Sequence, residues 1–251
     1  MEDGRWSLRV CPVTFQAMDL LSLRLAAGGG SIDHHESAAL VAAGFTLLQR
    51  SPALVRALSG RRAGLVLPPS PQFLVALAAA EGRGAVLLDA NASAHEVADA
   101  VRKMAIGALF AFSGAKTRLP ASVVAVLLDE APRSAAVLKP RGERHHVDLG
   151  SHFPIRIEGV TDVPGREEEC LATADEHTGG WAKRSHREVL EAGRQSSPAP
   201  GPLDRLVIRG ASWADYASLI ETGIGPLLAG SRLRTESESA RLAGDSSIRG
   251  Y

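Results

Sequence analysis

An alternation of short apolar runs and helical patterns between residues 63 and 128 constrains the fold more than any other feature. The segments 71–81 and 94–105, which separate the first three runs, place apolar residues at helical spacing. Strands joined by helices of this length pair in parallel through right-handed crossovers. The sequence therefore predicts an α/β fold in which helices cover both faces of a layered, mostly parallel sheet. The apolar runs with the length and composition of buried strands are 63–67, 85–88, 107–112 and 123–128.

Local signals at the helix ends support this pattern. Ser70 precedes Pro71, which combines an N-cap hydroxyl with a first-turn proline. Ser93 and Glu96 have the spacing of a capping box, which opens the second helix. An earlier helical pattern is interrupted by Pro52, whose missing amide proton predicts a break into two helices.

The chain is expected to consist of one folded domain with a less regular segment before it and another after it. Residues 1–35 are predicted to form an irregular lead-in, whose apolar piece at 15–25 is compatible with a short helix. Residues 36–230 are predicted to form the α/β domain and residues 231–251 a disordered tail. Prolines and charged clusters predict loops over 129–169, around at most one short strand at 155–158. Further strands are expected at 170–173 and 206–208, and further helices at 186–195 and 213–228.

The composition excludes several classes of protein. Lys+Arg 28 balances Asp+Glu 28, and this lack of a basic excess argues against a nucleic-acid partner. Cys11 and Cys170 cannot form a disulfide framework and are expected to be inert, buried thiols. No apolar run approaches the ~20 residues of a membrane span, and the N-terminus lacks the apolar centre of a signal peptide. We therefore expect a cytoplasmic protein with no membrane span.

The segment 173–183 is the candidate phosphate-binding site. Thr178 offers a hydroxyl, Gly179 and Gly180 let backbone amides approach an anion, and Lys183 offers a positive charge. The spacing differs from that of a Walker A loop, in which Gly and four further residues precede Gly-Lys-Ser/Thr. Taken alone, these residues fit a plain turn better than a phosphate site.

The remaining polar residues do not suggest a second site. His34-His35 and His145-His146 are adjacent pairs, and neighbours on a strand point to opposite faces, so they are poor shared ligands for a metal ion. Solvated histidines are the simpler interpretation. No residue is therefore assigned as a metal ligand or as a catalytic group.

Several short segments occur in an order that one known family shares. Over about residues 36–233, this order resembles the N-terminal half of the AMP-forming acyl-CoA synthetase superfamily, the adenylate-forming ligases. The segments that carry the resemblance are 63–68, 71–77, 84–88, 94–97, Thr178-Gly179, Ser185-His186-Arg187 and 224–230.

The resemblance implies a fold like the first half of the large N-terminal domain of these ligases. In that family, ATP and a carboxylic acid give an acyl-adenylate and pyrophosphate, and Mg²⁺ balances the charge of the phosphates. The thiol of coenzyme A or of a carrier protein then takes the acyl group. By the same resemblance, Thr178, Gly179, Gly180 and Lys183 correspond to the loop that binds ATP.

Two departures from the family pattern predict weak or no activity for this chain alone. Asp175 and Glu176 stand where the family loop has a hydroxyl residue and a glycine. A carboxylate ~4 Å from a phosphate charge is repelled by about 1 kcal/mol even in water. The family's adenine segment, its ribose-binding aspartate and its C-terminal domain have no counterpart in the sequence. We therefore expect a divergent, truncated ligase-like protein with a degenerate phosphate loop.

Two alternatives to a ligase-like enzyme stay open. The chain could be a non-catalytic binding or assembly module that docks a protein partner on the truncated sheet edge and on the helix expected at 213–228. It could also be a gene remnant that yields no folded product.

Overall fold

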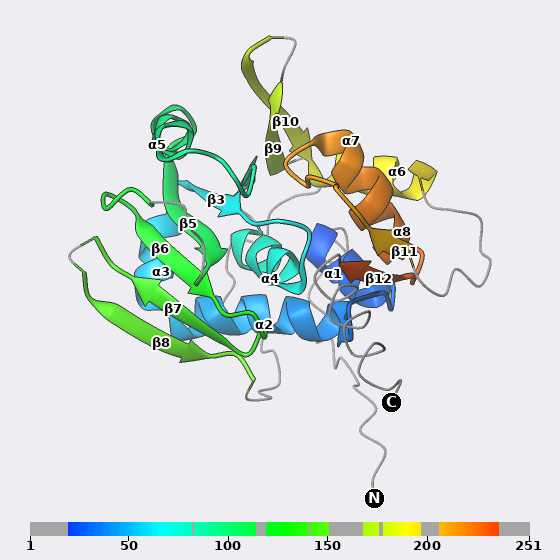
Figure 1. The fold of residues 1–251 in the computed structure, drawn as a ribbon, viewed down its shortest axis with the longest axis horizontal. Helices are drawn as coiled ribbons and strands as arrows, with labels where there is room; N and C mark the ends of the chain where they lie inside the picture. The colour runs from blue at the N-terminus through cyan, green and yellow to red at the C-terminus, as the bar shows by residue number, and fades with distance from the viewer. Residues whose placement is uncertain are drawn as a thin grey trace, which may run out of the picture.

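A mixed sheet organises the computed structural model, which describes residues 20–81, 83–113, 119–140, 142–150, 168–175, 178–196 and 206–235 (Figure 1). Within these residues the sheet has eight strands in the order β10-β9-β4-β3-β5-β6-β7-β8. The run from β9 to β6 pairs in parallel, whereas β10, β7 and β8 are antiparallel to their neighbours. The bounds are β3 (Arg62–Val66), β4 (Ala85–Leu88), β5 (Ile106–Phe112), β6 (Val124–Leu128), β7 (Ser134–Leu138), β8 (Arg144–Asp148), β9 (Glu169–Asp175) and β10 (Gly180–Ser185).

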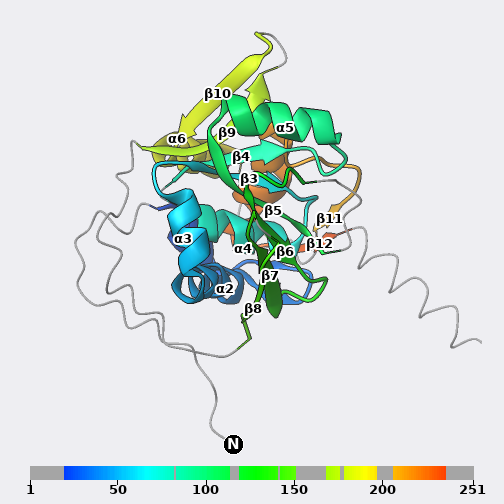
Figure 2. The ribbon, with the colours of Figure 1, turned by 90° about the vertical axis from the view of Figure 1, so that its left-hand side faces the viewer.

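Helices cover both faces of this sheet, as Figure 2 shows. Leu65 of β3 faces a buried cluster shared with α2 and α4, whereas Val66 faces a second cluster shared with α5. Successive strand residues point to opposite faces, so a strand buried on both sides is apolar at every position. The predicted α/β class, with helices on both faces of a mostly parallel sheet, is confirmed. The helices on these faces are α2 (Ser37–Arg50), α3 (Pro52–Leu58), α4 (Pro71–Ala80) and α5 (Ala94–Lys103).

The predicted end signals act as caps. The Ser70 hydroxyl accepts from the Phe73 amide at 3.3 Å, and Ser93 and Glu96 form a reciprocal capping box. Pro52 begins α3, which is bent by 94° from α2. Within the described ranges no single helix has the length and apolar character of a membrane span, although α2 and α3 together pass by length and composition.

A second, smaller sheet corrects the expected boundaries of the domain. Within the described residues it has the order β11-β12-β1-β2, and β12 lies in the segment expected to be a disordered tail. The lead-in is also ordered from Leu20 onward, since α1 (Leu21–Ala27) packs against α2 and both β1 and β2 lie before residue 37. Residues 1–19 and 236–251 lie outside the described residues. The strands are β1 (Ser31–Ile32), β2 (His35–Glu36), β11 (Leu206–Ile208) and β12 (Arg232–Thr235).

The physical reason for this error is that the second sheet joins residues about two hundred positions apart. Ser31 pairs with Arg232, and the Thr235 amide donates to the Asp33 carboxylate at 2.7 Å. Strands of two to four residues carry no readable period of their own. Their order comes from the pairing, which the local sequence does not show.

The expectation for residues 129–169 is also wrong in part. Residues 134–148 form an antiparallel pair, β7 and β8, at the end of the large sheet. The strand β8 is an edge strand with four of its five residues exposed, so its sequence of charged and histidine residues does not resemble a buried strand. The strand expected at 155–158 lies outside the described residues.

The helix expected at 213–228 is shorter and interrupted. It consists of α7 (Tyr216–Leu219), a π-helical turn (Ile220–Ile224) and α8 (Gly225–Leu228), with Pro226 just after the turn. Its apolar side is core, because Trp213, Leu219, Ile224 and Leu227 are buried. This burial contradicts the expectation that this helix offers a docking surface.

A buried polar cluster fastens α1 to the body of the fold. The first amides of α1 have no partner within the helix, and two side chains accept from them. Leu21 N–H donates to Nδ1 of His186 at 3.2 Å, and Ser22 N–H donates to Oε1 of Glu81 at 2.9 Å. His186 begins α6 (His186–Ser196), and Glu81 caps α4. The Cys170 thiol is buried beside Glu81, and burial raises the pKa of this thiol well above its ordinary value.

Burial also shifts Glu81 and His186, the two side chains that accept from α1, toward their neutral forms. Burial raises the pKa of Glu81 to about 8, partly offset by the Ser22 hydrogen bond, and lowers the pKa of His186 to about 4. The folded protein therefore holds the Glu81 proton more tightly than the unfolded chain does, and stability falls as the pH rises from about 4.5 to about 8. His186 acts in the opposite direction between about pH 4 and 6.5. Between pH 6.5 and the ordinary range of a thiol, Glu81 is the group of this cluster that changes the stability, and the buried Cys170 thiol adds a decline only at higher pH.

We expect the free energy of unfolding to fall by about 2 kcal/mol between pH 6.5 and 8.5 because of Glu81. Glu81→Gln keeps an oxygen that can accept from Ser22 and removes the titrating proton, so this decline should be absent. Urea unfolding at several pH values measures it. Glu191→Gln, at an exposed position of α6, is the matched control and should retain the decline. Equal pH dependence in wild type and Glu81→Gln would contradict the assignment.

Candidate functional site

The candidate phosphate-binding residues lie on a β-hairpin. Figure 1 shows β9 and β10 projecting together from one end of the sheet. Thr178 and Gly179 belong to the turn, Gly180 begins β10, and Lys183 lies within β10 opposite Ala172. The expected order of strand, turn, lysine and helix is therefore modified, since a second strand carries the lysine before α6 begins. Glu176 and His177 lie outside the described residues.

The polar groups of the turn bond to one another. The Thr178 hydroxyl donates to Oδ2 of Asp175 at 2.7 Å and accepts from the Gly180 amide at 3.3 Å. The Gly179 amide donates to the carbonyl of Asp175 at 2.8 Å. Gly179 has a φ of 65°, which glycine adopts without the steric cost of a side chain. Two of these amides and the hydroxyl are therefore used within the hairpin.

The ammonium group of Lys183 faces the opposite end of the hairpin. Its Nζ atom lies 3.7 Å from Oε2 of Glu169, the first residue of β9, whereas Thr178 lies beyond the last residue of β9. The strand β9 has 7 residues, so its two ends are roughly 20 Å apart. The structure therefore brings Thr178, Gly179 and Gly180 together and does not bring Lys183 to them.

Glu169 lies between two basic side chains, Arg62 and Lys183. Nη2 of Arg62 donates to its Oε2 at 2.7 Å, and a second bond from Arg62 makes the pair bidentate. Arg62 lies on β3 and Glu169 on β9, with β4 between them, so the pair clamps the amino ends of three strands. The hydrogen bond that Arg62 donates to Glu169 raises the pKa of Arg62. Both side chains are about three-quarters buried, whereas Lys183 is 54% exposed.

The carboxyl ends of the parallel strands hold polar residues that the sequence analysis did not single out. Asp89 follows β4 directly, and its Oδ2 accepts from the Ser212 hydroxyl at 2.9 Å. Gln72 of α4 donates to the carbonyl of Asp129, which follows β6, at 2.7 Å. In open α/β sheets ligands bind at this edge, where neighbouring connections diverge. The usable signal was a polar residue placed immediately after a buried strand.

The other candidates are placed without forming a shared site. His145 and His146 are exposed neighbours on β8 and point to opposite faces. Cys170 is buried, and Cys11 lies outside the described residues. Over the described part of the chain, no three His, Cys, Asp or Glu side chains come together as metal ligands would.

Solved structures share this fold at low sequence identity. A nonribosomal peptide synthetase, FmoA3, in its AMPPNP-bound form has a TM-score of 0.63 and 17% identity over 86% of this chain. A Mycobacterium tuberculosis fatty acyl CoA synthetase has a TM-score of 0.60 and 16% identity over 88% of this chain. The N-terminal domain of FACL13 from Mycobacterium tuberculosis has a TM-score of 0.56 and 16% identity over 86%.

These matches show the fold of the N-terminal portion of adenylate-forming enzymes. This chain spans 22% of the FmoA3 chain, 45% of the fatty acyl CoA synthetase and 56% of the FACL13 domain chain. No protein-family model matches the sequence, and no curated protein matches it.

The geometry of Glu169 predicts a structural role for the clamp and a small one for Lys183. Glu169→Ala leaves the Arg62 guanidinium, which is about three-quarters buried, without its carboxylate. We expect a loss of about 1–3 kcal/mol of unfolding free energy. Lys183→Ala removes the longer and more exposed ion pair with Glu169. This change should lower the free energy of unfolding by under about 1 kcal/mol. Chemical denaturation of both variants measures this. A larger loss for Lys183→Ala than for Glu169→Ala would contradict the assignment.

Proposed function

We propose that this chain is a divergent protein of the adenylate-forming ligase type that forms little or no acyl-adenylate by itself. The shared fold supports the kinship, and the hairpin geometry supports the weak activity. The observation that carries the proposal is the hydrogen bond between Thr178 and Asp175. The Thr178 hydroxyl, which would face a phosphate, is bonded instead to the Asp175 carboxylate, and this carboxylate repels a phosphate.

The residues at the hairpin do not fit the triphosphate of ATP. A phosphate cradle needs amides, a hydroxyl and a cation that converge on one point. Here the Gly179 and Gly180 amides bond within the turn, and the Lys183 ammonium lies beside Glu169. Asp175 adds a negative charge at the mouth of the turn. ATP with Mg²⁺, a carboxylic acid and an acceptor thiol are the ligands of the family reaction, and the hairpin of this chain offers the phosphates no convergent set of donors. A cytoplasmic setting is part of the same proposal.

We expect MgATP to leave the melting temperature of the protein unchanged. A ligand at 100 times its dissociation constant would add ~2.7 kcal/mol, which a thermal melt detects. ATP–pyrophosphate exchange with a panel of carboxylic acids should stay at the background rate. A full-length adenylate-forming ligase serves as the positive control.

Variants separate the effect of the acids from the effect of the remaining hairpin geometry. In Asp175→Ser with Glu176→Gly, the repulsion is removed, and a small ATP-dependent stabilisation should appear. Glu191→Gln changes a carboxylate on α6 and should not produce it. A clear shift of the wild-type protein with MgATP, or exchange above background, would overturn the proposal.

A non-catalytic assembly module is the second candidate, favoured by one observation. The strand β11 is the edge of the smaller sheet, and its Leu206 and Val207 are each 39% exposed. An open edge strand with apolar side chains is a template for pairing with another chain. Light scattering coupled to size-exclusion chromatography tests this function. We expect a concentration-dependent dimer that Val207→Pro converts to a monomer, and a wild-type monomer at all concentrations would count against a self-assembling edge.

The same protein preparation tests the remnant hypothesis. A single cooperative thermal transition, with loss of near-ultraviolet circular dichroism, is expected for a chain with this buried core. A gradual, non-cooperative signal would favour a product without a packed interior.

A further inference from the structure

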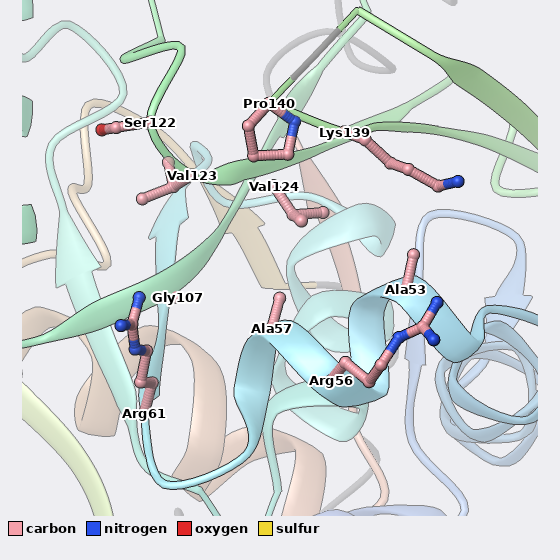
Figure 3. Close-up of a pocket in the computed structure, with 10 residues that line it drawn as sticks. All are labelled: Ala53, Arg56, Ala57, Arg61, Gly107, Ser122, Val123, Val124, Lys139 and Pro140. Carbon is pink, nitrogen blue, oxygen red and sulfur yellow. The ribbon is translucent and has the colours of Figure 1, made fainter.

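A pocket of about 350 Å³ lies at the edge of the sheet opposite to the carboxyl ends of the parallel strands. It lies between α3 and the amino ends of β5 and β6, close to the end of β7 (Figure 3). The hairpin β9–β10 is at the far side of the sheet, separated from β5 by β4 and β3. This pocket is therefore distinct from the β9–β10 hairpin and from the carboxyl ends of the parallel strands.

The floor of the pocket is apolar. Ala53 and Ala57 of α3 face Val123 and Val124 at the start of β6 across it, and Pro140 closes one side. The helix approaches β5 closely here, because a Cβ atom on Gly107 would lie 1.9 Å from the carbonyl oxygen of Ala57. The floor is thus built from small side chains and closely packed backbone.

The rim of the pocket is positively charged. Arg61 lies on one side and Arg56 and Lys139 lie on the other, as Figure 3 shows, and the lining holds no carboxylate. Lys139 is paired with Glu143, which is outside the lining. Across the described residues, neither the Arg56 nor the Arg61 side chain has a hydrogen bond or an ion pair with the protein. Two guanidinium groups are therefore available to a ligand.

We propose that this pocket binds a small organic anion, a carboxylate or phosphate ester on a compact apolar body. The apolar floor would take the body of the ligand, and the guanidinium on one side of it, that of Arg56 or that of Arg61, would take the anionic group through paired donors. The volume lies at the lower end of the range for small-molecule sites. It suits a single ring system or a short acyl chain.

The proposal is tested by binding of four probes to the whole chain labelled at its valine methyl groups. The probes are 2-naphthoate, 2-naphthyl phosphate, 2-naphthol and inorganic phosphate. We expect the two aromatic anions to shift the methyl signals of Val123 and Val124, and we expect these shifts to saturate as the ligand concentration rises. The stronger of the two anions identifies the head group. The neutral naphthol and inorganic phosphate should each bind at least ~10-fold more weakly, since each lacks one of the two interactions.

Arg56→Gln with Arg61→Gln should weaken binding of the aromatic anions ~10-fold or more. The matched control is Arg102→Gln, an exposed arginine of α5 on the other face of the sheet, which should leave binding unchanged. Thermal melts of both variants show that each is folded. Equal binding of naphthol and naphthoate, equal binding of inorganic phosphate, absence of shifts at Val123 and Val124, or no effect of the double substitution would each overturn the proposal.

Discussion

The helix α4 constrains the rest of the structure, because all ten of its residues are buried. A helix that is apolar on every side needs cover on every side. The sheet supplies one side, and α2 supplies another so closely that a Cβ atom on Gly44 would lie 2.5 Å from the carbonyl of Val75. The remaining cover comes from α1 and from the segment around Trp213, whose ring packs edge-on against Phe73 at 4.8 Å. Segments from both ends of the described chain, α1 and the residues around Trp213, therefore pack against α4.

The polar groups of the candidate phosphate loop are bonded within the protein. In this chain the turn between β9 and β10 satisfies its own hydroxyl and amides, and the lysine belongs to a clamp between β3 and β9. A group that is bonded within the protein must break that bond before it meets a ligand, so the geometry stabilises the hairpin and disfavours an anion there. At the opposite edge of the sheet the situation is reversed. Arg56 and Arg61 carry charge that the described residues leave uncompensated, beside a floor of small apolar side chains.

Much of the fold was predictable because its signals are local. The four central strands and the helices between them were found from apolar runs and caps, with bounds that differ by a few residues. The resemblance to adenylate-forming ligases rested on the order of short segments and agrees with the solved structures of similar fold. The errors fall on β7 and β8, whose outer strand is exposed, and on β1 and β12, whose partners are remote in sequence. The π-helical turn was missed because a helical stripe does not reveal a change of hydrogen-bond register.

The sequence by itself determined the α/β class, the parallel centre of the sheet and the residue types of the candidate loop, since each depends on composition and spacing over ten or so neighbours. Only the tertiary structure decided what those residues do. The direction of Lys183 depends on Glu169 and Arg62, which meet from strands more than a hundred positions apart. Asp89 and Ser212 meet in the same way, and so do α3, β6 and β7 around the cationic pocket. Contacts of this kind depend on packing between segments that are distant in the sequence, and a local sequence pattern does not predict them.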